Sequence, residues 1–306
     1  MSNIDTQEEE DEEYTEDDEE YTDEYEEYTD EYEDYTEDDG DKVALLAFYK
    51  SSGMEQHFPD RWNINVPYRN WYGVETSNDD RVTKLCCEGG LEGEIPPEIG
   101  DLSELEKFYL HYSVLKCSIP KTIGNLKKLK ILSLISNRKI WGPIPREIGN
   151  LVSLTELNLA DNALSGPLPR EIGNLSKLTR LALYHNKLTG PLPPEIGNLV
   201  NLEFLDLDYN SLSGWLPLSI SNLTKLLYFC LQGNKVECID PDNGQLDSGD
   251  MEYLTAHFNK YSANVKTCLH GTIVGKRGSY HLPAELIEHH IAPYLISPQF
   301  SKLPNY

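Results

Sequence analysis

The chain has 306 residues and a formal net charge of −26. Of its 52 acidic residues, 24 fall within residues 1–41, which contain no Lys or Arg, so the remainder carries 28 acids against 26 bases. A near-neutral body with an acidic tail lacks the basic footprint that phosphate backbones require, which argues against nucleic-acid binding. No run of about 18 apolar residues occurs, so no membrane span is expected.

Residues 1–41 are a low-complexity segment in which Tyr-Thr pairs recur every seven residues from Tyr14 to Thr36. Such a segment buries too little apolar surface to offset its ordering entropy, and its charges repel, so we expect it to be disordered. Two roles stay open. The tail is either a solvated extension or a phosphoacceptor segment, because Thr15 and Thr36 are each followed by three acids.

The first predicted helix covers residues 42–49, where apolar side chains recur at helical spacing after Asp41. The central part of the chain then repeats. Residues 151–198 spell one 24-residue unit twice, as LVSLTELNLADNALSGPLPREIGN and LSKLTRLALYHNKLTGPLPPEIGN. Further copies cover residues 199–222, 126–150 and 102–125. The copy at 126–150 has one extra residue before Ile140, and the copy at 102–125 has Ser113 and Cys117 at the Asn and Gly positions. Partial copies cover residues 81–101 and 223–238.

Each offset in the unit has a physical reason. Leu157 and Leu159 alternate with polar residues, which predicts a short strand with one buried side. Asn162 suits a turn, because its side-chain amide can bond the backbone of that turn and also reach the next copy. Gly166 suits a turn that a β-carbon would disfavour. Residues 171–173 predict one tight helical turn stopped by glycine. One copy buries about seven apolar residues, roughly 10–20 kcal/mol, which is less than its ordering costs, so the copies must stack.

The pattern N-x-L-x-G-x-[IL]-P-x-x-[IL]-G-N resembles the plant-type leucine-rich repeat family, with residues 42–80 similar to its N-terminal cap. The resemblance implies an α/β solenoid: a horseshoe with a parallel concave β-sheet, an N-terminal helical cap and a small C-terminal helical extension. The expected parts are an acidic tail (1–41), a cap (42–80), an array of six or seven coils (81–238) and a C-terminal cap and extension (239–306).

Several features predict a cytoplasmic, intracellular location. The first ten residues lack the basic start and apolar core of a signal peptide. The family's secreted cap carries two cysteines where this chain has Arg69 and Thr76. The six cysteines do not form the pattern of a disulfide framework, so we interpret them as buried thiols and leave only a Cys230–Cys238 pair open.

The concave face is the predicted binding site for a protein partner. Tyrosines on that face are rigid side chains that suit interface anchors, although tyrosine also simply tolerates strands. The predicted site residues are Tyr109, His111, Tyr112, Asn158, Asp161, Tyr184, His185, Asp206, Asp208, Tyr209 and Tyr228. No catalytic, cofactor or metal motif is recognised, and the C-terminal histidines fit no structural zinc spacing.

Three functions are weighed for this non-enzymatic chain. The first is a protein-interaction scaffold. The second is a ubiquitin-ligase substrate adaptor, because residues 281–295 are similar to the start of F-box-like and other cullin-adaptor boxes; the same stretch also suits an ordinary packing helix. The third is an enzyme inhibitor, like the plant inhibitors of pectin-degrading enzymes that share this repeat, and it would require secretion.

Overall fold

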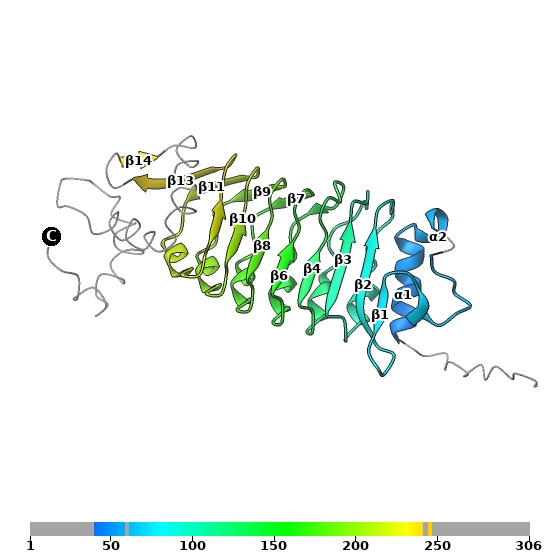
Figure 1. Ribbon diagram of the computed structural model, residues 1–306. Coiled ribbons are helices and arrows are strands. Elements are labelled where there is room, and N and C mark those ends of the chain that lie inside the picture. The colour runs from blue at the N-terminus through cyan, green and yellow to red at the C-terminus, as the bar shows by residue number, and fades with distance from the viewer. Residues whose placement is uncertain (1–39, 59–60, 241–243, 247–306) are drawn as a thin grey trace, which may run out of the picture. The chain divides into compact units, whose positions relative to one another are not determined.

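The computed structural model describes residues 40–58, 61–240 and 244–246. Its main element is an eight-stranded sheet with the order β1-β2-β3-β4-β6-β8-β10-β12 (Figure 1). β1 is antiparallel to β2, and the other seven strands run parallel, as predicted. The strands are β1 (Val74–Thr76), β2 (Val82–Glu88), β3 (Lys107–His111), β4 (Ile131–Ser133), β6 (Glu156–Asn158), β8 (Arg180–Ala182), β10 (Phe204–Asp206) and β12 (Tyr228–Cys230).

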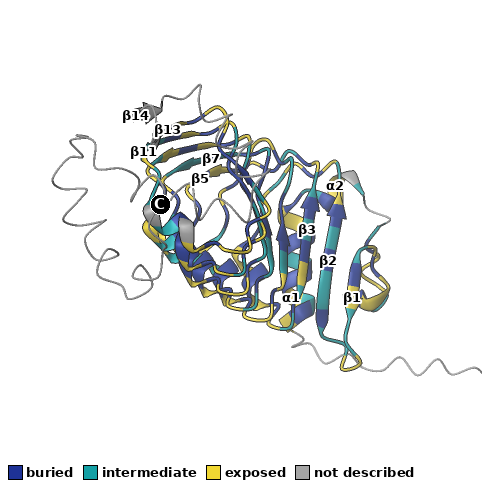
Figure 2. Cartoon of the chain, turned by 60° about the vertical axis from the view of Figure 1, so that its left-hand side comes forward, coloured by how far each residue is buried: buried dark blue, intermediate teal, exposed yellow. Residues whose placement is uncertain are grey.

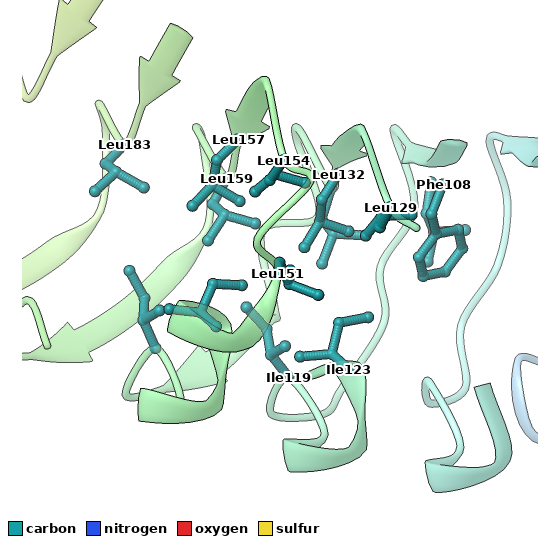
Figure 3. Close-up of a cluster of buried hydrophobic side chains, with 14 of the residues drawn as sticks. Phe108, Ile119, Ile123, Leu129, Leu132, Leu151, Leu154, Leu157, Leu159 and Leu183 are labelled. Atoms are coloured by element: carbon teal, nitrogen blue, oxygen red, sulfur yellow. The ribbon is translucent and has the colours of Figure 1, made fainter. Parts of the chain in front are cut away.

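The predicted leucine spine is confirmed by the strand register. Leu157 pairs with Leu181, and Leu181 pairs with Leu205, so the same side chain recurs at each strand. All three are fully buried. Figure 3 shows how leucines from neighbouring coils interdigitate behind the strands, above the isoleucines Ile119 and Ile123 of the opposite side. Each coil therefore completes its core with atoms of the next coil.

A second sheet, which we did not predict from the sequence, has the order β14-β13-β11-β9-β7-β5. Its strands are β5 (Trp141–Gly142), β7 (Ala163–Gly166), β9 (Lys187–Gly190), β11 (Ser211–Trp215), β13 (Lys235–Asp240) and β14 (Gly244–Leu246). Gly142, Gly166, Gly190 and Gly214 all have φ between 76° and 83° in these strands. Cys117 replaces this glycine in the preceding coil, which has no strand in the second sheet among the described residues.

Short 3-10 helices close each coil on the side opposite the large sheet (Figure 1). They are η2 (Pro97–Asp101), η3 (Lys121–Asn125), η4 (Arg146–Asn150), η5 (Arg170–Asn174), η6 (Pro194–Asn198) and η7 (Leu218–Asn222), and η1 (Tyr68–Asn70) lies in the cap. The expectation that Gly173 stops its helix was wrong, since it lies inside η5. A β-carbon on Gly173 would lie 2.4 Å from the carbonyl oxygen of Glu195, so glycine is there to let the next coil approach.

The asparagines form a ladder between coils as predicted, but each reaches the preceding coil and not the next one. The Nδ2 of Asn186 donates to the carbonyl oxygens of Leu159 (2.9 Å) and Leu183 (3.1 Å), and its Oδ1 accepts from the Leu164 N–H (3.0 Å). The extra residue before Ile140 interrupts this pattern, because the Ile140 N–H instead donates to the Asn137 carbonyl (2.8 Å). The buried Oδ1 of Asn162 is consequently left without a hydrogen-bond partner.

The cap consists of α1 (Gly40–Ser51), α2 (Met54–His57) and an aromatic cluster under the first coil. Trp62 and Trp71 stack with ring centroids 4.9 Å apart. Asp41 does not open the helix as predicted, because α1 begins at Gly40 and the Asp41 carboxylate is buried. It instead accepts from Arg81 (2.8 Å) and from the Val82 N–H (2.7 Å), and so fastens the cap to the first coil.

Several predictions fall on residues outside the described part of the chain. These are the acidic tail up to residue 39, the C-terminal helices and the box-like stretch 281–295. The Cys230–Cys238 pair also stays a prediction, because the side chain of Cys238 is not described. Cys86, Cys87 and Cys117 are free thiols, and burial raises the pKa of Cys87 to about 12, which makes that thiol chemically inert.

Candidate functional site

The outward side of the seven parallel strands, with the residues that follow each strand, is called the concave face here. Figure 2 colours the chain by burial, and buried residues alternate with half-buried or exposed ones along strands such as β3. The register aligns one outward row of Lys84, Lys107, Ile131, Glu156, Arg180, Phe204 and Tyr228, and a second row of Cys86, Tyr109, Ser133, Asn158, Ala182, Asp206 and Cys230. All eleven predicted residues lie on this face or directly after its strands.

The position that precedes each ladder asparagine, or Ser113 in the coil that lacks one, has an unusual backbone. His185 (φ 53°), Tyr209 (φ 50°) and Tyr112 (φ 54°) adopt the left-handed conformation there. Non-glycine residues pay roughly 1–2 kcal/mol for this conformation. The turn imposes it in every full coil, so the bulky side chains at these positions are held in a fixed direction at the edge of the concave face.

The C-terminal cluster comprises Arg180, Tyr184, His185, Phe204, Asp206, Asp208, Tyr209 and Tyr228. One edge of it is the stack of His185 on Tyr209, whose ring centroids are 4.6 Å apart. A β-carbon on Gly233 would lie 2.8 Å from Cδ1 of Tyr209, so glycine at the equivalent position of the next coil leaves room for this ring. Tyr209 is therefore held on both sides, although 47% of it is exposed.

The opposite edge of the cluster is a ladder of three planar groups. The Arg180 guanidinium lies 3.8 Å from the centroid of Phe204, and the Phe204 ring stacks on Tyr228 at 4.4 Å with an interplanar angle of 4°. Arg180 and Phe204 were missed in the sequence, although Tyr228, at the same repeat position, was among the predicted site residues. The signal was present, because the residue before the inward leucine also points outward in an alternating strand.

Two carboxylates lie between these edges. Asp206 is only 8% exposed, and its Oδ1 accepts from the Asp208 N–H (3.2 Å). Asp208 in turn accepts from the Gln232 N–H (2.6 Å). Burial raises the pKa of both carboxyl groups, and the charge of Asp206 further raises the pKa of Asp208. The C-terminal cluster is thus electronegative.

The N-terminal cluster comprises Tyr109, His111, Tyr112 and Ser133. The His111 ring packs edge-on against Tyr109 (5.7 Å) and Tyr112 (6.1 Å), and its Nε2 lies 2.8 Å from the Ser133 hydroxyl. Burial lowers the pKa of His111, which favours the neutral ring. The predicted residues therefore divide into a neutral cluster and an electronegative one, and Asn158 and Asp161 lie on the coil between them.

Comparison with known proteins identifies the repeats. The Leucine Rich Repeat family model matches residues 153–175, 177–199 and 201–223. The chain contains leucine-rich repeats and has the leucine-rich repeat fold. A probable receptor-like serine/threonine-protein kinase, RPK1 of Arabidopsis thaliana, is 34% identical over 24% of this chain and 18% of its own length. Polygalacturonase inhibitor 2 of Arabidopsis thaliana is 36% identical over 31% of this chain and 30% of its own length.

The leucine-rich repeat protein spans less than a third of either curated relative in these matches. Its match to the kinase relative is confined to the repeats. Among solved structures, a plant ice-binding protein is 31% identical, with 64% of each chain covered and a TM-score of 0.57.

The predicted cytoplasmic location is wrong. The curated relatives are plant receptor-like proteins and polygalacturonase inhibitors, which are extracellular leucine-rich repeat domains. The missing cap cysteines misled the prediction. The leucine-rich repeat protein holds its cap by other means, with Arg69 paired to Asp80 (2.9 Å) and Asp41 paired to Arg81 (2.8 Å).

Within the described residues, no helix combines the length and the apolar character that crossing a membrane demands.

Proposed function

We propose that this protein binds a segment of a protein partner on its concave face, with the C-terminal cluster as the main contact. Its relatives include receptors and inhibitors, which work by binding other molecules. The observation that carries the proposal is the set of aromatic side chains held there without burial. The exposed ring of Tyr209 stacks on His185, and the ring of Phe204 stacks on Tyr228. Pre-arranged aromatic rings lose little entropy on binding and are typical of interface anchors.

The test replaces Tyr184 and Tyr209 by alanine in the full chain and compares affinity capture from a cell-surface and secreted protein fraction. Both side chains lie outside the leucine core, so the variant should keep the unfolding midpoint of the unmodified chain within a few degrees. Capture of the partner should fall strongly. A matched control replaces Tyr72, an exposed tyrosine of the cap, and should capture normally. Unchanged capture by the double variant would reject the concave face as the site.

An inhibitor role is the first specific form of this proposal, because a polygalacturonase inhibitor is among the relatives. Residual polygalacturonase activity at increasing concentrations of the full chain tests it directly. Inhibition that the Tyr184 and Tyr209 replacements remove would place the enzyme on the concave face. The ubiquitin-ligase adaptor has no support from the relatives.

Ice binding is a second candidate function, favoured by the match to a plant ice-binding protein over 64% of both chains. The second sheet offers a suitable surface. Ser165, Thr189 and Ser213 occupy the same repeat position in consecutive coils, next to buried leucines. The strand register pairs Thr189 with Ser211, so these two hydroxyls lie on neighbouring strands about 4.8 Å apart. Thr189→Lys should then lower thermal hysteresis and weaken control of ice recrystallisation. Thr224→Lys, at an exposed threonine outside that row, should change neither. Absence of both activities in the unmodified chain would reject this candidate.

A further inference from the structure

Asp206 carries a charge that its local structural role does not need. Asn158 holds the same repeat position two coils earlier, in the same outward row. Its Oδ1 accepts from the N–H two residues on, Ala160 (3.2 Å), as the Oδ1 of Asp206 accepts from Asp208 (3.2 Å). A neutral amide therefore satisfies this turn. The negative charge of Asp206, in a side chain that is almost fully buried, calls for a different explanation.

The surroundings of Asp206 have the composition of a cation-binding site. Asp206 and Asp208 are two residues apart on β10 and just beyond it, so both face the concave side. Tyr184 and Tyr228 lie on the neighbouring coils. Burial raises the pKa of Tyr184, and a hydrogen bond with Cys230 raises the pKa of Tyr228; the charge of Asp206 adds to both increases. Aromatic faces and carboxylates attract the same ligand class, an ammonium or guanidinium group.

The cations already present do not neutralise this site. Arg180 stacks on Phe204 and lies 3.7 Å from Glu156 of the preceding strand, so its charge is shared with another carboxylate. Arg180 and His185 both act to lower the pKa of Asp206, yet the effect of burial is larger and the pKa stays raised. A further positive group placed at this point would offset that cost.

We propose that the C-terminal cluster binds a lysine or arginine side chain of the partner segment, with Asp206 and Asp208 as its charge partners and the rings of Tyr184 and Tyr228 beside it. The inference rests on the proposed function, and it specifies the chemistry of the segment that the concave face recognises.

The experiment selects twelve-residue peptides from a display library on the immobilised full chain. Selected peptides are synthesised with each arginine replaced by citrulline, or each lysine by norleucine, which removes the charge but keeps most of the shape. Affinity for the unmodified chain should fall about 10- to 100-fold for one such position, the range expected for a hydrogen-bonded charge pair. The unsubstituted peptides should bind an Asp206→Asn/Asp208→Asn variant weakly, and replacing their arginine or lysine should change that affinity little.

A matched control replaces Glu98 and Asp101, two exposed acids of η2, by Gln and Asn. It removes the same net charge, retains the acidic N-terminal segment, and should bind the peptides like the unmodified chain. Melting curves by circular dichroism verify that each variant is folded.

The outcomes separate the two proposals. One outcome is that the peptides bind less tightly to the Tyr184 and Tyr209 alanine variant but tolerate the loss of their positive charges. This outcome would overturn the cation site while the proposed function stands. Peptides that bind elsewhere, or a selection that yields none, would overturn both. Equal weakening in the Glu98/Asp101 control would show a general effect of net charge and also overturn the cation site.

Discussion

The buried and the outward sides of the same strands follow opposite rules. Toward the core, Leu157, Leu181 and Leu205 repeat without change. On the outward side, the neighbouring position changes from Asn158 to Ala182 to Asp206. Stacking forces uniformity on the core, because each coil completes the next. The outward side has no such requirement, so its residues are free to differ from coil to coil.

The largest effect is expected from breaking the core. Leu181→Ala removes a fully buried side chain in the middle of the array and should lower the free energy of unfolding by about 2–5 kcal/mol. Denaturant titration followed by circular dichroism measures this change. Val152→Ala serves as the control, because Val152 is exposed and should change stability little. Similar losses in both variants would mean that the coils do not share one core.

A smaller effect is expected from the contact between the 3-10 helices. Gly173→Ala places a β-carbon 2.4 Å from the Glu195 carbonyl oxygen, so the coils must separate slightly. Overpacking of this kind costs typically about 1–3 kcal/mol. The same denaturant titration should show this loss, and Gly173→Ser should be no milder. A neutral result for Gly173→Ala would show that adjacent coils adjust freely, against the rigid stacking described above.

The sequence predicted the features that depend on one residue at a fixed offset. The spine leucines, the asparagine ladder and the left-handed Gly166 belong to this group, since each residue type has one physical reason to recur. The second sheet and the role of Gly173 were missed because they depend on contacts between residues about 24 positions apart. A pattern within one repeat does not reveal what a carbonyl oxygen of the next repeat touches.

The candidate site was predicted only in part for the same reason. Tyr184, His185, Asp206, Asp208, Tyr209 and Tyr228 were chosen individually as outward residues, and their grouping follows from the stacking of coils. The stack of Arg180, Phe204 and Tyr228 requires the register between three strands. The location was mispredicted because the absence of two cap cysteines shows only that the cap has no disulfide there. Ion pairs stabilise the cap of this chain instead.

The smallest effect on stability, and the sharpest test of the outward side, concerns the pH dependence of Asp206. Burial raises its pKa in the folded chain above the unfolded value of about 3.9, so the folded state binds the proton more tightly. The stability that the folded state gains by binding this proton is fully present below about pH 4, and it is lost as the pH rises through the raised pKa of Asp206. Asp206→Asn lacks the titration and keeps an Oδ1 for the Asp208 N–H.

The variant should therefore be more stable than the unmodified chain at pH 7, and this advantage should disappear near pH 3. Removing the charge also lowers the pKa of Asp208, which Asp206 raises, and this adds to the advantage at neutral pH. Urea titrations of both proteins at the two pH values give the difference, in which the many other carboxyl groups cancel. A constant difference across pH would mean that the carboxylate is well solvated. A gain in stability at pH 7 together with weaker peptide binding would show that the charge at position 206 serves the ligand at the expense of the fold.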